Sequence, residues 1–185
     1  MLVFKTEKDF YTSVIKSLEE LDPRWESYKK GIIIVGSHEP EDIDRKLEII
    51  QHAREDKRPL LGICMGMQLM CIEYARNVLN YQNANSTEID ANTLYPIITK
   101  LPELRVGIRL VENRFESHWH NYAFNNLYKS YFEKEWNLIF TENILEKIIL
   151  KDHPFFVGVQ YHPEYQNSEK KPHPLLREFI NKCRN

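Results

Sequence analysis

The sequence has few cysteines, no long apolar run and no excess of charge of one sign. Its three cysteines are an odd number without the spacing of a disulfide framework, so a disulfide-built secreted domain is not expected. No segment approaches the ~20 apolar residues of a membrane helix, and Lys5 interrupts the N-terminal apolar stretch. Basic and acidic side chains number 25 and 27. We therefore expect a cytoplasmic protein that binds neither nucleic acid nor a membrane.

The chain also lacks internal repeats and a phosphate-binding loop of the G-x-x-x-x-G-K type. An ATP-driven activity within these residues is therefore not expected, and nothing in the sequence calls for a cofactor. The 185 residues, 42% of them hydrophobic, suffice for one domain with a substantial core. We expect residues 1–185 to form a single domain.

Apolar residues recur with alternating helical and strand-like spacing along the chain. The spacing predicts helices at 8–21, 41–55, 66–79 and 173–183, and strands at 31–36, 60–63, 104–112, 137–140 and 155–161. The polar stretch 80–96 is expected to be a long loop. A strand, helix, strand, helix order predicts an α/β fold with an open, mostly parallel sheet flanked by helices.

A cysteine lies between two glycines at a predicted junction of strand and helix, in the sequence "LLGICMGMQL". Small neighbours such as Gly62 and Gly66 permit a sharp backbone turn that would expose the Cys64 thiol, and the helix N-terminus would stabilise a thiolate or an oxyanion. The pattern alone is weak, because a free cysteine is often a small core residue. From these residues, a buried structural thiol and a nucleophile are about equally supported.

A histidine and a glutamate follow the last predicted strand, in "VGVQYHPEYQ". A thiol nucleophile needs a base, and the base needs an acceptor that fixes its tautomer. His162 and Glu164 fit these roles at the carboxyl end of a strand, where open α/β sheets place their sites. A second pair, His118 and His120, has H-x-H spacing, but no third ligand is evident and we expect no metal site.

Together these motifs resemble the class I glutamine amidotransferase family, within it the glutaminase domains of CTP synthases. Residues 58–90 resemble the nucleophile strand, elbow, helix and following loop of those domains. Residues 156–166 resemble their histidine and glutamate motif, and 10–21 their first helix. The resemblance spans nearly the whole chain and implies a flavodoxin-like sheet with a nucleophile elbow.

The resemblance implies roles for individual residues. Cys64 would attack the side-chain amide of glutamine to form a γ-glutamyl thioester, and ammonia would leave with a proton from His162. Water activated by His162 would then release glutamate, while Glu164 orients the imidazole. The backbone N–H groups of Met65 and Ser37 would form the oxyanion hole.

The same resemblance places the amino acid end of the substrate near Gln68, Glu88, Asn121 and Tyr122. The relatives carry an arginine where this chain has Asn121. Loss of that cation removes a charge-assisted hydrogen bond of roughly 1.5 to 3 kcal/mol. Affinity for free glutamine is expected to fall on the order of tenfold to a hundredfold.

Two further departures concern the turn after the second strand and the length of the chain. Ser37, His38 and Glu39 stand where the family usually has glycine, an aromatic residue and glycine. A positive φ at such a residue would cost about 1 kcal/mol and reshape the oxyanion hole. The large synthetase domain of CTP synthases has no counterpart in these 185 residues.

Three functions are consistent with these features. The first is an independent Cys-His-Glu hydrolase that cleaves glutamine or a small γ-glutamyl compound. The second is a glutaminase subunit that supplies ammonia to a separate synthetase subunit. The third is a non-catalytic relative that binds a ligand or a partner. The sequence does not determine the oligomeric state.

Overall fold

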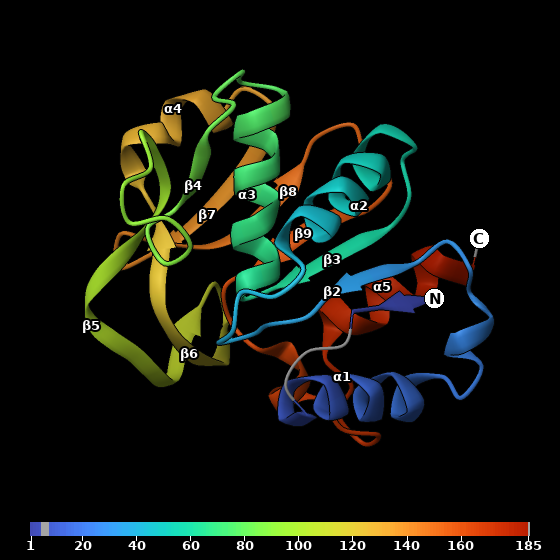
Figure 1. The fold of residues 1–185 in the computed structure, drawn as a ribbon. Coiled ribbons are helices and arrows are strands. Elements are labelled where there is room, and N and C mark those ends of the chain that lie inside the picture. The colour runs from blue at the N-terminus through green and yellow to red at the C-terminus, as the bar shows by residue number, and fades with distance from the viewer. Residues whose placement is uncertain (5–7, 185) are drawn as a thin grey trace.

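The computed structural model describes residues 1–4 and 8–184, and these form two sheets with helices packed around them (Figure 1). The central sheet has the strand order β1-β2-β3-β9-β8-β7. Its strands are β1 (Leu2–Val3), β2 (Ile32–Ile34), β3 (Leu60–Ile63), β9 (Phe156–Val159), β8 (Ile144–Leu150) and β7 (Trp136–Thr141). The first four strands in that order are parallel, and β8 and β7 are antiparallel additions at one edge.

Two layers of helix cover the central sheet. The helices are α1 (Lys8–Leu21), α2 (Ile43–Glu55), α3 (Met65–Asn77), the short α4 (Lys129–Phe132) and α5 (Pro174–Arg184). Single 3-10 turns are η1 (Trp25–Ser27), η2 (Asn126–Tyr128) and η3 (Pro163–Gln166). Helices α2 and α3 pack on one face, and α1 and α5 on the other (Figure 1). The predicted α/β fold with an open, mostly parallel sheet is therefore confirmed.

Both faces of the parallel strands are buried because side chains alternate between two apolar cores. In β2, Ile32 and Ile34 pack with α2 and α3, whereas Ile33 packs with α1 and α5. All three side chains are fully buried. This explains why β2 appears in the sequence as a continuous apolar run without alternation.

The second sheet corrects the expectation of a structureless segment at 80–96. Strand β4 (Ala84–Ser86) lies inside that segment and pairs with β5 (Tyr95–Val111), which begins well before the predicted strand at 104–112. Strand β5 continues through a tight turn into β6 (Arg114–Phe124), and the two form a long antiparallel hairpin. Polar turn-forming residues obscured β4, because a three-residue strand gives almost no periodic signal.

Strand β8 was not predicted because Glu146 and Lys147 interrupt its apolar pattern. The Glu146 side chain is fully buried, and its carboxylate accepts hydrogen bonds from Arg105 at 2.9 Å and from His118 at 2.9 Å. A buried carboxylate is tolerated only with such partners. Both partners come from the β5–β6 hairpin, so tertiary contacts alone make this strand sequence acceptable.

None of the helices in the part of the chain that the structure describes has the length and apolar character needed to span a membrane.

Candidate active site

Cys64 occupies a strained turn between β3 and α3. Its φ of 52° and ψ of −108° lie outside the regions that residues other than glycine ordinarily adopt. The Cys64 N–H donates to the carbonyl of Val159 at 2.7 Å, so the neighbouring strand fixes the turn. The side chain faces a cavity, and the residue remains buried overall. This geometry is that of a nucleophile elbow.

The two glycines that flank Cys64 are required by packing. A Cβ atom at Gly66 would lie 2.2 Å from the carbonyl oxygen of Ile34, so α3 can approach β2 only because this position has no side chain. A Cβ at Gly62 would lie 2.5 Å from the sulfur of Met70 and 2.8 Å from the Gly66 backbone. The close approach of helix and strand holds the elbow in place.

His162 and Glu164 form a buried pair where β9 ends and η3 begins. Nδ1 of His162 donates to the Glu164 carboxylate at 2.7 Å, and both side chains are buried. The backbone N–H of His162 donates to the carbonyl of Ser117 on β6, which ties the histidine to the hairpin. The carboxylate therefore fixes the imidazole tautomer and leaves Nε2 for other chemistry.

Aromatic rings hold the His162 imidazole from both sides. The ring of Phe10 on α1 stacks on it with a centroid distance of 5.1 Å, and Tyr165 stacks at 5.4 Å. Sequence reasoning assigned Phe10 only to the core face of a helix. Its contact with His162 depends on how α1 packs against η3, which no local motif encodes.

Burial, a carboxylate and a thiol act on the His162 imidazole together. Desolvation by burial lowers its pKa, but the charges of Glu164 and Cys64 and the hydrogen bond to Glu164 outweigh that effect. The net result raises the pKa of His162 to about 10. The charged imidazolium is thus stabilised next to the sulfur of Cys64.

Gly36, in the turn after β2, lies close to both His162 and Cys64. A Cβ at Gly36 would lie 3.0 Å from Cε1 of His162 and 3.2 Å from Cβ of Cys64. The following Ser37 hydroxyl donates to the carbonyl of Glu39 at 2.6 Å and accepts from the Glu39 N–H at 3.1 Å. Neither of these residues, nor His38 between them, has a positive φ. The three substituted positions are therefore free of the left-handed strain that the sequence suggested.

Gln160 is a site residue that sequence reasoning missed. Its side chain is fully buried, and Nε2 donates to Sγ of Cys64 at 3.6 Å. Its amide oxygen accepts from Nε2 of Gln68 at 3.2 Å, and Gln68 also donates to the carbonyl of Tyr122 at 3.0 Å. The sequence offered one signal for this role: Gln160 is a polar residue directly after an apolar strand and two positions before His162.

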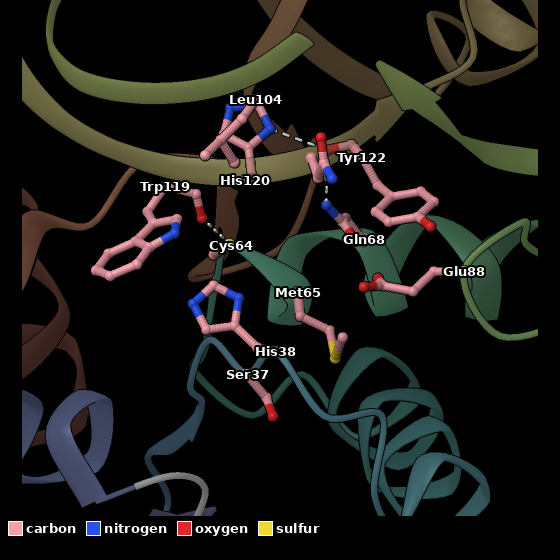
Figure 2. A pocket seen from close by; sticks show the side chains of 11 residues that line it. Ser37, His38, Cys64, Met65, Gln68, Glu88, Leu104, Trp119, His120 and Tyr122 are labelled. Carbon is pink, nitrogen blue, oxygen red and sulfur yellow. Dashed lines mark hydrogen bonds between the residues drawn. The ribbon is translucent and has the colours of Figure 1, made fainter. Parts of the chain in front are cut away.

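A cavity of about 310 Å³ lies in front of Cys64 (Figure 2). Most of the sequence-predicted site residues line it, namely Ser37, Cys64, Met65, Gln68, Glu88, Asn121 and Tyr122. In Figure 2, Glu88 and Tyr122 lie to one side of Cys64, Trp119 lies to the other, and His38 lies below Cys64. His162 and Glu164 do not line the cavity, and both side chains are buried.

The H-x-H pair on β6 is held by hydrogen bonds to other protein groups, one of them on β8. His118 bonds through Nε2 to Glu146, while Nδ1 of His120 donates to the carbonyl of Tyr122 at 2.9 Å. Burial lowers the pKa of His120 to about 4, so its imidazole is neutral. Within residues 1–4 and 8–184, no group of three or more potential ligands is arranged to hold a metal ion.

Comparison with known proteins identifies the class to which this fold and site belong. The family model for "Glutamine amidotransferase class-I" matches residues 6–182. The chain therefore belongs to the class I glutamine amidotransferase family, as the motifs around Cys64 and His162 predicted.

Curated relatives of the chain include CTP synthases. The CTP synthase of Coprothermobacter proteolyticus is 40% identical over 181 residues, which cover 83% of this chain and 34% of that protein. The Thermotoga maritima enzyme is 38% identical over 195 residues, which cover 88% of this chain and 36% of the relative. The chain thus spans about a third of the length of these relatives, and it is homologous to their glutaminase domain.

Solved structures show the same fold. The glutaminase domain of Trypanosoma brucei CTPS with bound acivicin superposes with a TM-score of 0.86 at 21% identity, over 99% of this chain and 92% of that one. A GMP synthase component from Thermoplasma acidophilum, described as putative, gives a TM-score of 0.63 at 16% identity, with the same coverage. At these identities the likeness establishes the fold alone.

Proposed function

We propose that this protein hydrolyses a γ-glutamyl amide through a thioester formed on Cys64. One arrangement carries the proposal: a strained elbow presents the Cys64 sulfur to a cavity, and the buried His162–Glu164 pair lies against the same Gly36 backbone. A chain without thiol chemistry would have little physical reason to combine a strained cysteine with an oriented, charged histidine.

The first half of the reaction forms the thioester. Sγ of Cys64 attacks the γ-carbonyl carbon of the substrate, and the amide nitrogen leaves as ammonia or an amine with a proton from His162. The carboxylate of Glu164 balances the imidazolium before that proton transfer. In the second half, His162 takes a proton from water, the hydroxide attacks the thioester, and the γ-carboxylate product leaves.

Backbone N–H groups would stabilise the developing oxyanion. Met65 is the first residue of α3, where N–H groups have no acceptor within the helix, and Ser37 follows β2 on the same cavity wall. We assign these two N–H groups to the oxyanion hole. Glu88, Asn121, Tyr122 and the amide oxygen of Gln68 would contact the rest of the substrate.

The test measures ammonia and glutamate release across glutamine and γ-glutamyl amides, for the wild type and Cys64→Ala. Activity in the wild type and none in Cys64→Ala would support the proposal. A parallel experiment treats the folded protein with a glutamine-analogue electrophile near neutral pH and locates the adduct by mass spectrometry. No adduct on Cys64 would contradict catalysis and favour a non-catalytic binding protein.

A second candidate, a glutaminase subunit of a separate synthetase, is favoured by one surface. The outer face of the β5–β6 hairpin exposes large apolar side chains, of which the first and last also line the cavity: Leu104, Val106, Ile108, Leu110, Phe115 and Trp119. Exposed fractions of 66% for Phe115 and 57% for Ile108 are typical of an unoccupied protein contact. Relatives about three times as long carry this domain joined to further sequence.

Titration with a synthetase tests this second candidate. A CTP synthase relative whose own nucleophilic cysteine is substituted would be added to the protein, and glutamine-dependent CTP formation would be measured. CTP formation that requires both proteins and falls with Phe115→Ser would support a subunit role. Unchanged glutamate release and no CTP would favour the independent hydrolase.

A further inference from the structure

The cavity in front of Cys64 carries an uneven charge. Of the described residues that line it, Glu88 is the only carboxylate, and none is a lysine or an arginine. His120 is neutral because burial lowers its pKa. The other histidine, His38, packs against the rings of Phe10 and Trp119, and Trp119 lies on the opposite side of Cys64 from Glu88 (Figure 2).

Glu88 is well placed to bind a cation. Figure 2 shows its carboxylate directed into the cavity, near the side chains of Gln68 and Tyr122. Its backbone N–H donates to the Ser86 hydroxyl at 3.1 Å, which anchors the residue to the end of β4. Burial raises the pKa of Glu88 because its charge is partly desolvated. An ammonium group of a ligand would restore the lost stabilisation of that charge.

A free α-carboxylate on the ligand would have no cationic side chain to pair with at the Glu88 end of the cavity, among the described residues that line it. Glutamine bound with its amide at Cys64 would bring an ammonium and a carboxylate to the Glu88 end, both attached to the α-carbon, which is three bonds from the reacting carbon. The ammonium is attracted by Glu88, but the carboxylate is repelled by it and finds no lysine or arginine among the described residues of the cavity wall.

Asn121 offers neutral hydrogen bonding instead. It is half-buried on β6 beside Tyr122 and lines the same cavity. A side-chain amide donates and accepts at once, so it can pair with both the oxygen and the N–H of another amide. Because Asn121 is partly exposed, a group attached to that second amide can extend out of the cavity.

We propose that the substrate is a glutamine γ-amide whose α-amine is free and whose α-carboxyl is held in an amide bond. This rests on the proposed hydrolysis at Cys64. Water replaces the γ-nitrogen: the bond from the γ-carbonyl carbon to nitrogen breaks, a bond to water oxygen forms, and ammonia leaves. The α-amide is retained in the product. Such a substrate is either a small α-amidated glutamine or the N-terminal glutamine of a peptide.

Ammonia release would be measured with L-glutamine, L-glutamine α-amide and L-glutaminylglycine. We expect kcat/KM for the α-amide to exceed that for glutamine by roughly ten- to a hundredfold, the loss caused by one unpaired carboxylate. Comparable rates for the α-amide and the dipeptide would indicate a peptide source, and a large advantage of the α-amide a small-molecule source. Glutamine as the best of the three would overturn the inference.

Asn121→Arg sharpens the test, because the added cation should reverse the preference toward free glutamine. Asn113→Arg, at the exposed turn between β5 and β6, adds the same charge away from the cavity and should leave the preference unchanged. If the protein hydrolyses glutamine faster than the α-amide and the dipeptide, only the substrate assignment is refuted. Failure to hydrolyse any γ-amide, together with an unlabelled Cys64, would refute the proposed function and this inference with it.

Discussion

The central sheet and the β5–β6 hairpin meet at the cavity, and they are built differently. On the sheet side, Cys64 and His162 follow strands that are buried on both faces, and glycines hold the backbones in close contact. On the hairpin side, Asn121 lies on a ribbon whose outer face is exposed. Dense packing allows few alternatives, whereas a partly exposed ribbon tolerates substitution. The candidate catalytic residues Cys64 and His162 lie on the first side, and Asn121, which we assign to substrate contact, lies on the second.

Breaking the buried pair on the sheet side should have the strongest effect. Glu164→Gln removes the carboxylate that orients and charges His162, and we expect amide hydrolysis to fall roughly a thousandfold. The pH dependence of Cys64 labelling should also change, because removing the charge of Glu164 lowers the pKa of His162. Glu116→Gln is the matched control, because it breaks another buried Glu–His pair, with His173 at 3.0 Å. Equal loss in both variants would contradict a special role for Glu164.

The same pair predicts how stability depends on pH. The folded-state pKa of His162, about 10, exceeds the ordinary value of 6.5, so the folded protein binds more protons between these values. The stabilisation from charged His162 is therefore fully present below about pH 6.5 and is lost as pH rises toward 10. Urea unfolding should show a larger loss in the wild type than in Glu164→Gln, which keeps only the contribution of Cys64. Parallel pH dependences would contradict it.

On the sheet side, adding a side chain at Gly66 next to the elbow should lower the free energy of unfolding. In Gly66→Ala the new methyl would meet the Ile34 carbonyl, so we expect about 3 kcal/mol of lost unfolding free energy and a displaced Cys64. Gly107→Ala on the hairpin meets no atom within 4 Å, and only its φ of 98° opposes the substitution, at about 1 kcal/mol. Denaturant unfolding measures both. Similar losses would erase the contrast between the sheet and the hairpin.

Removing the donor to the sulfur should have a moderate effect. Gln160→Leu keeps the approximate volume but deletes the hydrogen bond to Cys64, so the thiolate is less stabilised. We expect electrophile labelling to slow by about tenfold, with unfolding free energy within about 2 kcal/mol of the wild type. Labelling at the wild-type rate would show that Gln160 serves packing alone.

The weakest effect should follow substitution on the outer face of the hairpin. Ile108 is 57% exposed, so Ile108→Thr should change the unfolding free energy by no more than about 0.5 kcal/mol. Turnover of a small γ-amide should be unchanged as well. A large loss of stability would show that this face is covered in the native protein, for instance by a second copy.

Predictability from sequence depended on whether the signal was local or came from segments far apart in the chain. The motifs around Cys64 and His162 identified the family, because strand, turn and helix signals there are local and mutually consistent. Strand β8 was missed since its buried Glu146 is acceptable only with Arg105 and His118 in place. Gln160 and Phe10 were missed as site residues for a similar reason: their contacts join segments far apart in the chain.

The family, the α/β fold and the order of most elements could be read from the amino-acid sequence, since apolar periodicity and a glycine-flanked cysteine are properties of neighbouring residues. The assembly of the site required the folded chain. Gly36 packs against both Cys64 and His162, the turn at Ser37 forms without positive φ, and Glu88 meets no lysine or arginine among the described residues of the cavity wall. These features depend on distances between segments that are remote in sequence, and such distances are fixed only when the sheet and the hairpin pack together.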